Sequence, residues 1–330
     1  MTDRSGSARS RGPAGPTISA NPNRIASSPG VILAMVVLVA VLIGANYSVM
    51  QIALGYTTPL ILTGMRLAIG GGALLAFTRW RGDPLPRDPK VLLGIFGVSL
   101  CVTTISSMTL VTGVSLVPAG VAALLSSLVP VWTALLAFGL LHERLSSKGT
   151  VGVVVGLVGA VVLSSPAIEG ETSLAGVVIL FVSGVAWASG IVLLRWWDFG
   201  GVGPVMITTV QLLMSTVVVV PIALLVEGTA ETDMGLPLLA PLLYASVPAL
   251  ALTFVLMARI TVEGSAMQAS SVAYLTPVFG VLFAWVIRSN RLSVAEWVGG
   301  ALLVLGVALV TSAGAATSAG AGATVRPGRR

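Results

Sequence analysis

The sequence predicts an all-α integral membrane protein of ten transmembrane helices, arranged as two five-helix repeats of inverted topology. Three observations predict this fold. Of the 330 residues, 55% are hydrophobic and only 9% are charged, whereas soluble domains carry about 25% charged residues. Apolar windows of about 20 residues, the length that spans a bilayer core, recur along the chain. The two halves of the chain also resemble each other.

The apolar windows define ten expected spans, joined mostly by short links that force neighbouring helices to run antiparallel. The spans are 31–54, 58–77, 91–112, 118–140, 148–165, 174–195, 204–226, 238–259, 266–287 and 294–312. We therefore expect a first repeat at 31–165 and a second at 166–312. Residues 1–30 and 313–330 are rich in small and polar residues, which predicts a disordered tail and a second flexible tail, both cytoplasmic.

The distribution of basic residues predicts the orientation. With the N-terminus in the cytoplasm, fifteen Lys and Arg residues fall on the cytoplasmic side and only Arg288 and Arg291 on the other. Because basic residues bias short loops to the cytoplasm, we expect both termini inside the cell (inner or plasma) membrane. The net charge of +6 comes from basic residues in the termini and short loops, a placement that membrane topology explains. The lipid bilayer rather than nucleic acid is therefore the expected partner.

An internal repeat connects the fourth and fifth spans to the ninth and tenth. At a single offset of 147, Pro130 matches Pro277, Arg144-Leu145-Ser146 matches Arg291-Leu292-Ser293, Gly152 matches Gly299 and Gly159 matches Gly306. The earlier spans match more weakly: Pro59 and Arg66 are seven residues apart, as are Pro204 and Gln211. Since five is odd, the second copy enters the membrane from the opposite side, as in transporters that bind substrate near the midplane.

These residues resemble the EamA-type family of the drug/metabolite transporter superfamily. The resemblance rests on Gly44-Ala45-Asn46, on Pro59 with Arg66, and on the run from Pro118 through Pro130 to Glu143-Arg144-Leu145, whose ending recurs after Pro277. Ile43 stands where the family often has Trp, with Trp187 in the similar place of the second copy, and Asn290 replaces the second acidic residue. The resemblance implies transport of small metabolites or drugs, often export, and names no substrate.

Arg66 is the one basic residue deep inside a span. A charge at a helix centre costs about 2.5 to 3.5 kcal/mol on insertion scales, and no Asp or Glu lies well inside any span. Its donors must therefore meet backbone carbonyls, Asn46, Gln51, Gln211, water or a ligand. Two interpretations stay open: Arg66 holds carbonyls or orients the second span, or it lines a cavity and contacts a carboxylate or other polar group of the substrate.

Other polar and aromatic side chains share faces with this position. Asn46, Tyr47 and Gln51 lie on one face with Met50, and Gln211 lies on one face with Thr208 and Ser215. Helix-to-helix hydrogen bonding is the alternative to ligand contact for such hydroxyl groups. The expected substrate-binding residues are Asn46, Tyr47, Gln51, Arg66, Ser127, Trp187, Gln211, Ser270 and Tyr274.

Two further features bear on movement and assembly. Pro130 and Pro277 each remove a backbone hydrogen bond inside a span, which predicts either a hinge or a fixed kink. Gly149, Gly152, Gly156 and Gly159 form a stripe that lets a helix approach closely, within the chain or across a homodimer.

The function predicted from these features is a secondary transporter of a small-molecule substrate, with amino acids or related compounds among the exported candidates. No GxxxxGK[ST] loop is present, so ATP does not drive it from within this chain. The spans lack the nucleophile and base of an enzyme, and the single Cys101 and His142 form no disulfide or zinc site, so no catalysis, metal or cofactor is expected. The alternative is a lipid-handling flippase or a membrane assembly subunit.

Overall fold

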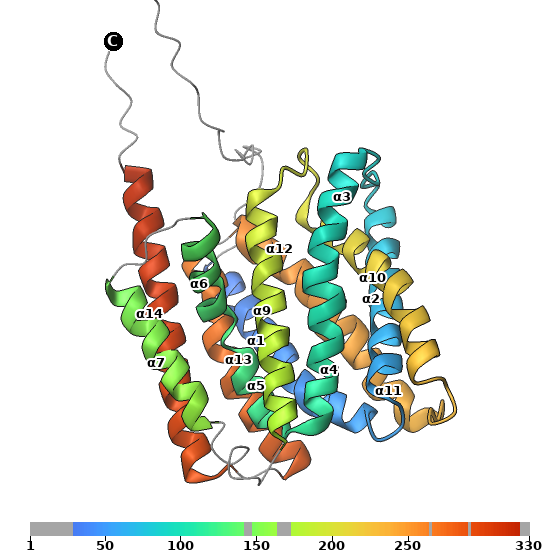
Figure 1. Cartoon of the computed structure of the whole chain (residues 1–330). Coiled ribbons are helices and arrows are strands. Elements are labelled where there is room, and N and C mark those ends of the chain that lie inside the picture. Colours follow the sequence, from blue (N-terminus) through green and yellow to red (C-terminus); the bar gives the residue numbers. More distant parts are fainter. Residues whose placement is uncertain (1–28, 142–146, 164–172, 264–265, 290–291, 324–330) are drawn as a thin grey trace, which may run out of the picture.

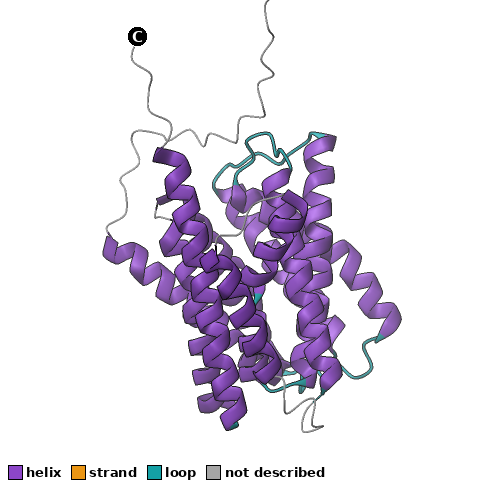
Figure 2. Ribbon diagram, turned by 60° about the vertical axis from the view of Figure 1, so that its left-hand side comes forward, coloured by secondary structure: helices purple, strands orange, loops and turns teal. Residues whose placement is uncertain are grey.

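The computed structural model describes residues 29–141, 147–163, 173–263, 266–289 and 292–323, and this part of the chain consists of helices and connecting loops without a strand (Figure 2). Seven helical segments are long and apolar enough to cross a membrane, and three shorter apolar helices lie at Ser147–Leu163, Leu275–Ile287 and Val294–Leu309. Together these ten segments correspond to the ten expected spans. The predicted all-α membrane fold is confirmed.

The first five spans are built from eight helical segments, because the third and fourth spans are interrupted. They are α1 (Pro29–Ala53), α2 (Pro59–Trp80), α3 (Pro89–Val98), the π-helical η1 (Ser99–Ile105), α4 (Ser106–Leu116), α5 (Ala119–Ser126), α6 (Val129–Leu141) and α7 (Ser147–Leu163). The Glu143-Arg144-Leu145 element and His142 lie outside the described residues.

The second five spans have one interruption, in the eighth. They are α9 (Leu174–Trp196), α10 (Pro204–Val226), α11 (Leu236–Ser246), the π-helical η2 (Val247–Leu252), α12 (Thr253–Glu263), α13 (Ala266–Arg288) and α14 (Val294–Ala323). α14 therefore takes in the first part of the expected C-terminal tail. Asn290, Arg291 and most of the expected N-terminal tail lie outside the described residues.

Helix starts follow from local sequence. α2, α3 and α10 each begin at a proline, whose missing N–H group is one that a helix start leaves unbonded in any case. Asp88 caps α3 by accepting from the Lys90 amide at 2.8 Å, and Ser173 caps α9 by accepting from the Gly176 amide at 3.1 Å. Such caps place the helix ends in the short links between spans.

The helices α7 and α14 pack side by side at one edge of the bundle, opposite the edge formed by α2 and α10 (Figure 1). A methyl group on Gly159 would lie 2.8 Å from the Gly299 carbonyl oxygen, and one on Gly306 would lie 2.7 Å from the Gly152 carbonyl oxygen. These are repeat-equivalent glycines, so the same contact is made twice, as two-fold symmetry requires. The glycine stripe of the fifth span therefore packs within the chain.

The two π-helical segments also occupy matching places in the repeats. The offset of 147 places Ser99, the first residue of η1, on Ser246, the residue before η2. Each segment packs against the second helix of the other repeat: η1 against α10 and η2 against α2. Sequence periodicity did not predict them, because a π-helix differs from an α-helix by one residue in a turn; such segments are frequent at functional sites.

The fourth and ninth spans differ in where their proline lies within the helix. The fourth is broken at residues 127 and 128, and Pro130 lies in the first turn of α6, where no interior hydrogen bond is lost. Pro277 lies inside α13, which continues through it. The two prolines therefore occupy different positions in their helices, and their role as hinges or fixed kinks stays a prediction.

The outer surface carries large apolar side chains, as a lipid-facing surface should. Along α7, Val151, Val154, Val158 and Val161 are all more than half exposed. Exposed tryptophans lie towards the helix ends, with Trp80 and Trp196 at the ends of α2 and α9 and Trp285 and Trp297 near the link between α13 and α14. Aromatic side chains at both membrane interfaces are typical of membrane proteins.

Candidate functional site

Arg66 on α2 is buried inside the bundle, with 6% of its surface exposed. Its Nη1 donates to the sulfur of Met50 on α1 at 3.2 Å, and its Nε is buried without a hydrogen-bond partner. A thioether is a weak acceptor, so this contact compensates little of the charge. Within the described part of the chain, no carboxylate and no backbone carbonyl bonds to Arg66.

Two of the predicted residues on α1 lie near Arg66. Tyr47 on α1 lies near Arg66 on α2 and Ser126 on α5, so side chains of three helices meet there. Asn46 precedes Met50 by one helical turn, about 6 Å along α1, and its Oδ1 is buried without a partner. A buried cationic donor and a buried neutral acceptor are thus both unsatisfied in this part of the bundle.

The side-chain amide of Gln51 is hydrogen-bonded to the backbone at the end of α4. Its Nε2 donates to the carbonyl oxygens of Val114 at 3.1 Å and Val117 at 2.6 Å, at the end of α4. The last carbonyls of a helix have no intrahelical partner, so this amide satisfies two groups that would otherwise be unpaired. The geometry gives Gln51 a packing role between α1 and α4.

Gln211, the repeat equivalent of Arg66, is buried on α10, and none of the hydrogen bonds among the described residues involves its side-chain amide. Its backbone carbonyl accepts from Ser99 Oγ at 3.0 Å. The amide offers both a donor and an acceptor to the interior of the bundle.

The remaining predicted residues are spread over several elements. Ser127 is buried and its hydroxyl donates to the Leu124 carbonyl at 2.6 Å, where the fourth span breaks. Trp187 on α9 stacks against Phe254 on α12, with ring centroids 6.4 Å apart. The side chains of Ser270 and Tyr274 lie outside what the structure describes, so their predicted roles remain predictions.

A hydroxyl cluster joins η1 to α10. Ser99 Oγ lies 2.8 Å from Ser215 Oγ, Thr104 Oγ1 donates to Ser215 Oγ at 2.9 Å, and Thr103 bonds to Ser215 as well. All four residues are buried. The polar face containing Ser215 predicted an inward orientation, but its partners could not be found without knowing that η1 crosses α10 here.

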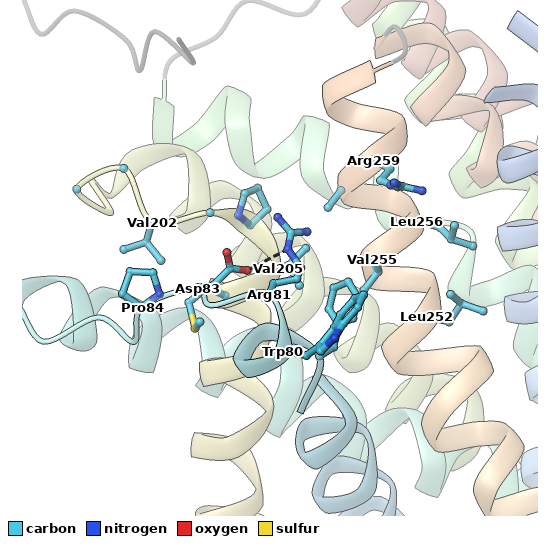
Figure 3. A pocket seen from close by; sticks show the side chains of 17 residues that line it. Trp80, Arg81, Asp83, Pro84, Val202, Val205, Leu252, Val255, Leu256 and Arg259 are labelled. Atoms are coloured by element: carbon cyan, nitrogen blue, oxygen red, sulfur yellow. Dashed lines mark ion pairs between the residues drawn. The ribbon is translucent and has the colours of Figure 1, made fainter. Parts of the chain in front are cut away.

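A cavity of about 960 Å³ opens between the C-terminal end of α2, the start of α10, and α12 (Figure 3). Trp80, Arg81 and Asp83 approach it from the α2 side, with an ion pair of 3.4 Å between Arg81 Nε and Asp83 Oδ2. η2 contributes Leu252, and α12 contributes Val255, Leu256 and Arg259. The sequence did not mark these residues as a site. Arg81 and Arg259 are only two of the fifteen basic residues from which a cytoplasmic side was predicted.

One face of α2 connects Arg66 with this cavity. Arg66, Gly70, Ala73 and Phe77 follow helical spacing, and Phe77 lines the cavity about 16 Å along the axis from Arg66. Between them η2 covers the face: a methyl group on Gly70 would lie 2.9 Å from the Ser246 carbonyl oxygen and 2.8 Å from Leu250 Cδ2. Arg66 is therefore closed off from the cavity by η2.

Comparison with known proteins gives a consistent result over both repeats. The model of the EamA-like transporter family matches residues 29–165 and 174–312. The uncharacterized transporter YvbV of Bacillus subtilis is 25% identical over 81% of this chain and 87% of its own length. The uncharacterized inner membrane transporter YedA of Escherichia coli (strain K12) is 29% identical over 81% of this chain and 86% of its own length.

Two further similarities concern a named activity and the fold. A protein of Salmonella typhimurium named "Probable amino-acid metabolite efflux pump" is 22% identical over 83% of this chain and 92% of its own length. A solved crystal structure superposes with a TM-score of 0.60 at 22% identity, covering 84% of this chain and 98% of that one. The latter similarity concerns the fold alone.

Proposed function

Because the chain belongs to the EamA-like transporter family, we propose that it is a secondary transporter that carries a small metabolite or drug across the cytoplasmic membrane by alternating access. The family match over both repeats and the membrane-spanning helices make it a multi-pass membrane transporter of small metabolites. The substrate contact, the mechanism and the direction of transport form the proposal.

The observation that carries the proposal is the unsatisfied Arg66. A buried guanidinium with an unpartnered Nε is costly unless something compensates it during the working cycle. Arg66 lies on the face of α2 that leads to the cavity, and its fixed fork of donors fits a carboxylate or another anionic group. We infer that Arg66 binds such a group of the substrate, with Asn46 and Tyr47 beside it.

The charge distribution supports an orientation in the membrane, and a similarity supports a direction of transport. Arg81 and Arg259 line the cavity at the end of the bundle where basic residues gather, which supports a cytoplasmic opening and cytoplasmic termini. The name of the similar protein from Salmonella typhimurium supports export of an amino-acid metabolite as the direction. In this proposal substrate is taken from the cytoplasm through the cavity and released on the other side.

The proposal is tested with purified protein in liposomes. Vesicles preloaded with one unlabelled compound should take up the same labelled compound faster than empty vesicles. In an alternating-access carrier the binding site returns to the outer face faster when it carries the internal compound than when it is empty. The panel comprises amino acids, other organic anions, nucleosides, sugars and cationic drugs, with Arg66→Gln as the matched variant. Trans-stimulated uptake of an anionic compound that Arg66→Gln abolishes supports the proposal.

Two outcomes would overturn it. Movement of fluorescent long-chain lipids between leaflets, with no uptake of any soluble compound, would favour the lipid-handling alternative. Uptake that Arg66→Gln leaves unchanged would remove Arg66 from the substrate path. Folding of the variant is checked by size-exclusion chromatography before either result is interpreted.

A further inference from the structure

The start of α2 is capped by a carboxylate from the other repeat. Glu227, at the C-terminal end of α10, accepts hydrogen bonds through Oε2 from the amides of Leu60 at 2.9 Å and Ile61 at 3.1 Å. Thr58, the residue before α2, provides no side-chain cap of its own. The first amides of a helix lack intrahelical partners and attract negative charge, so Glu227 supplies what the start of α2 needs.

Other contacts close the same end of the bundle. Thr57 Oγ1 lies 3.0 Å from Thr232 Oγ1, and the Asp233 amide donates to the Tyr56 carbonyl at 2.8 Å. We name these contacts, together with the Glu227 cap, the cross-repeat latch. It joins the link between α1 and α2 to the link between α10 and α11.

The opposite end of the α2–α10 pair is open. The residue before α10, Gly203, provides no side-chain cap, and the first-turn residues Val205 and Met206 line the 960 Å³ cavity. Asp83 lines the same cavity, just beyond the C-terminal end of α2, and pairs with Arg81 instead of with α10. The side chains of that ion pair are a third to a half exposed, so holding it stabilises little.

The internal repeat relates these two ends. The offset of 145 that places Arg66 on Gln211 places Leu60 and Ile61 on Val205 and Met206. It also places Gly82, the neighbour of Asp83, on Glu227. At both ends, therefore, a helix start without a cap from its own preceding residue faces a carboxylate beyond the end of the partner helix, but only the Glu227 end is joined by hydrogen bonds.

We propose that Glu227 and Asp83 act as alternating helix caps, one at each end of the α2–α10 pair. In the state described here Glu227 caps α2, and Asp83 pairs with Arg81 across the cavity lining that it shares with the start of α10. In the other state Asp83 leaves Arg81 and accepts from the amides of Val205 and Met206, while Glu227 releases α2. Each state then keeps one of the two helix starts capped, which keeps their free energies close enough for both to be populated.

This inference rests on the proposed alternating access, but its first test, a labelling experiment, needs no substrate. In a Cys101→Ser background, Ile61→Cys reports on the latch end, because Ile61 is 7% exposed, and Val202→Cys reports on the cavity. Each reporter is combined with Glu227→Gln or Asp83→Asn. A membrane-impermeant maleimide is applied to right-side-out and to inside-out vesicles, and the rate of labelling is measured.

The two acid variants should shift labelling in opposite directions. Loss of a typical helix cap implies a change of about fivefold in the balance between states. Glu227→Gln should therefore raise labelling at the latch end about fivefold and lower it in the cavity, and Asp83→Asn should do the reverse. Glu231→Gln is the matched control, because Glu231 is exposed in the same loop as Glu227 and makes no hydrogen bond to α2 among the described residues. It should change neither rate.

Equal labelling in native protein and in a folded Glu227→Gln variant would overturn the inference, as would a shift in the same direction by both acid variants. A second measurement covers a variant that fails to fold. The paired substitutions Thr57→Cys and Thr232→Cys should cross-link readily in the ligand-free protein and block transport until reductant is added. Failure to cross-link would contradict a closed latch. Normal transport in the cross-linked protein would contradict alternating caps while leaving the transporter proposal intact.

Discussion

The Nη1 atom of Arg66 lies 3.2 Å from the sulfur of Met50, and this contact ties α2 to α1 inside the membrane-spanning part of the bundle. A thioether accepts weakly, so Met50 positions the guanidinium without neutralising it. The charge stays available to a stronger acceptor. A purely structural arginine would instead have its donors occupied by carbonyls or a carboxylate.

Met50→Leu should be tolerated. The substitution removes the sulfur while keeping most of the volume, so the free energy of unfolding should fall by less than about 1.5 kcal/mol. Stabilisation by a bound substrate should persist, because the anionic group and not the thioether compensates Arg66. Thermal unfolding with and without substrate measures both quantities. Loss of the substrate effect in folded Met50→Leu would assign Met50 a larger role.

Gln51→Leu should destabilise the fold while leaving substrate recognition intact. The variant leaves the Val114 and Val117 carbonyls without their donor, and unsatisfied buried polar groups cost about 1 to 3 kcal/mol. Equilibrium unfolding in mixed detergent measures the loss. Ser189→Ala is the control, since that exposed hydroxyl bonds only within α9. A change in substrate affinity without a change in stability would contradict this assignment.

Gly159→Ala and Gly306→Ala should each lower stability by about 1 to 3 kcal/mol, because a methyl group there meets the backbone of the facing helix. The two effects should be similar, since the glycines are repeat equivalents. Gly139→Ala serves as control, as a methyl group at Gly139 meets nothing within 4 Å. If all three variants unfold at the same temperature as the native protein, the close packing of α7 on α14 is refuted.

The hydroxyl cluster should couple η1 to α10. Interhelical hydrogen bonds in membranes average about 0.6 kcal/mol and reach about 1.7 kcal/mol. In a double-mutant cycle, Ser99→Ala and Ser215→Ala should therefore show a coupling of this size, because the two oxygens lie 2.8 Å apart. Additive effects of the two substitutions would indicate that the hydroxyl groups act separately.

The spans and the repeat could be predicted because hydrophobic length and a fixed offset are properties of the chain itself. Gly152, Gly159, Gly299 and Gly306 were found by their spacing, and their reciprocal contacts follow from it. The interruptions could not be predicted. A π-helical segment changes the register by one residue in a turn and leaves hydropathy unchanged, so η1 and η2 carry no signal in the sequence.

The candidate site was predicted in part for a related reason. Arg66 stood out because charge is rare in an apolar span, and the spans hold no acidic residue that could pair with it, as is found among the described residues. For Gln51 the sequence did not show that its amide nitrogen bonds to Val114 and Val117, because side-chain chemistry does not say which neighbour is bonded; its expected substrate contact stays a prediction. Glu227 and Asp83 were overlooked, since acidic residues in links are ordinary until the helix starts that face them are known.

Whether Arg66 binds an anionic substrate is tested by thermal unfolding of native protein and Arg66→Gln against a panel of carboxylates and matched uncharged compounds. The second repeat has glutamine at the equivalent position, Gln211, so the variant places there a polar side chain that the other repeat already buries. At 100 times its dissociation constant, a ligand stabilises the folded state by about 2.7 kcal/mol. We expect a carboxylate to raise the unfolding temperature of native protein only, and the ligand-free variant to be at least as stable as native protein. A destabilised Arg66→Gln variant that still responds to the same compound would contradict this expectation.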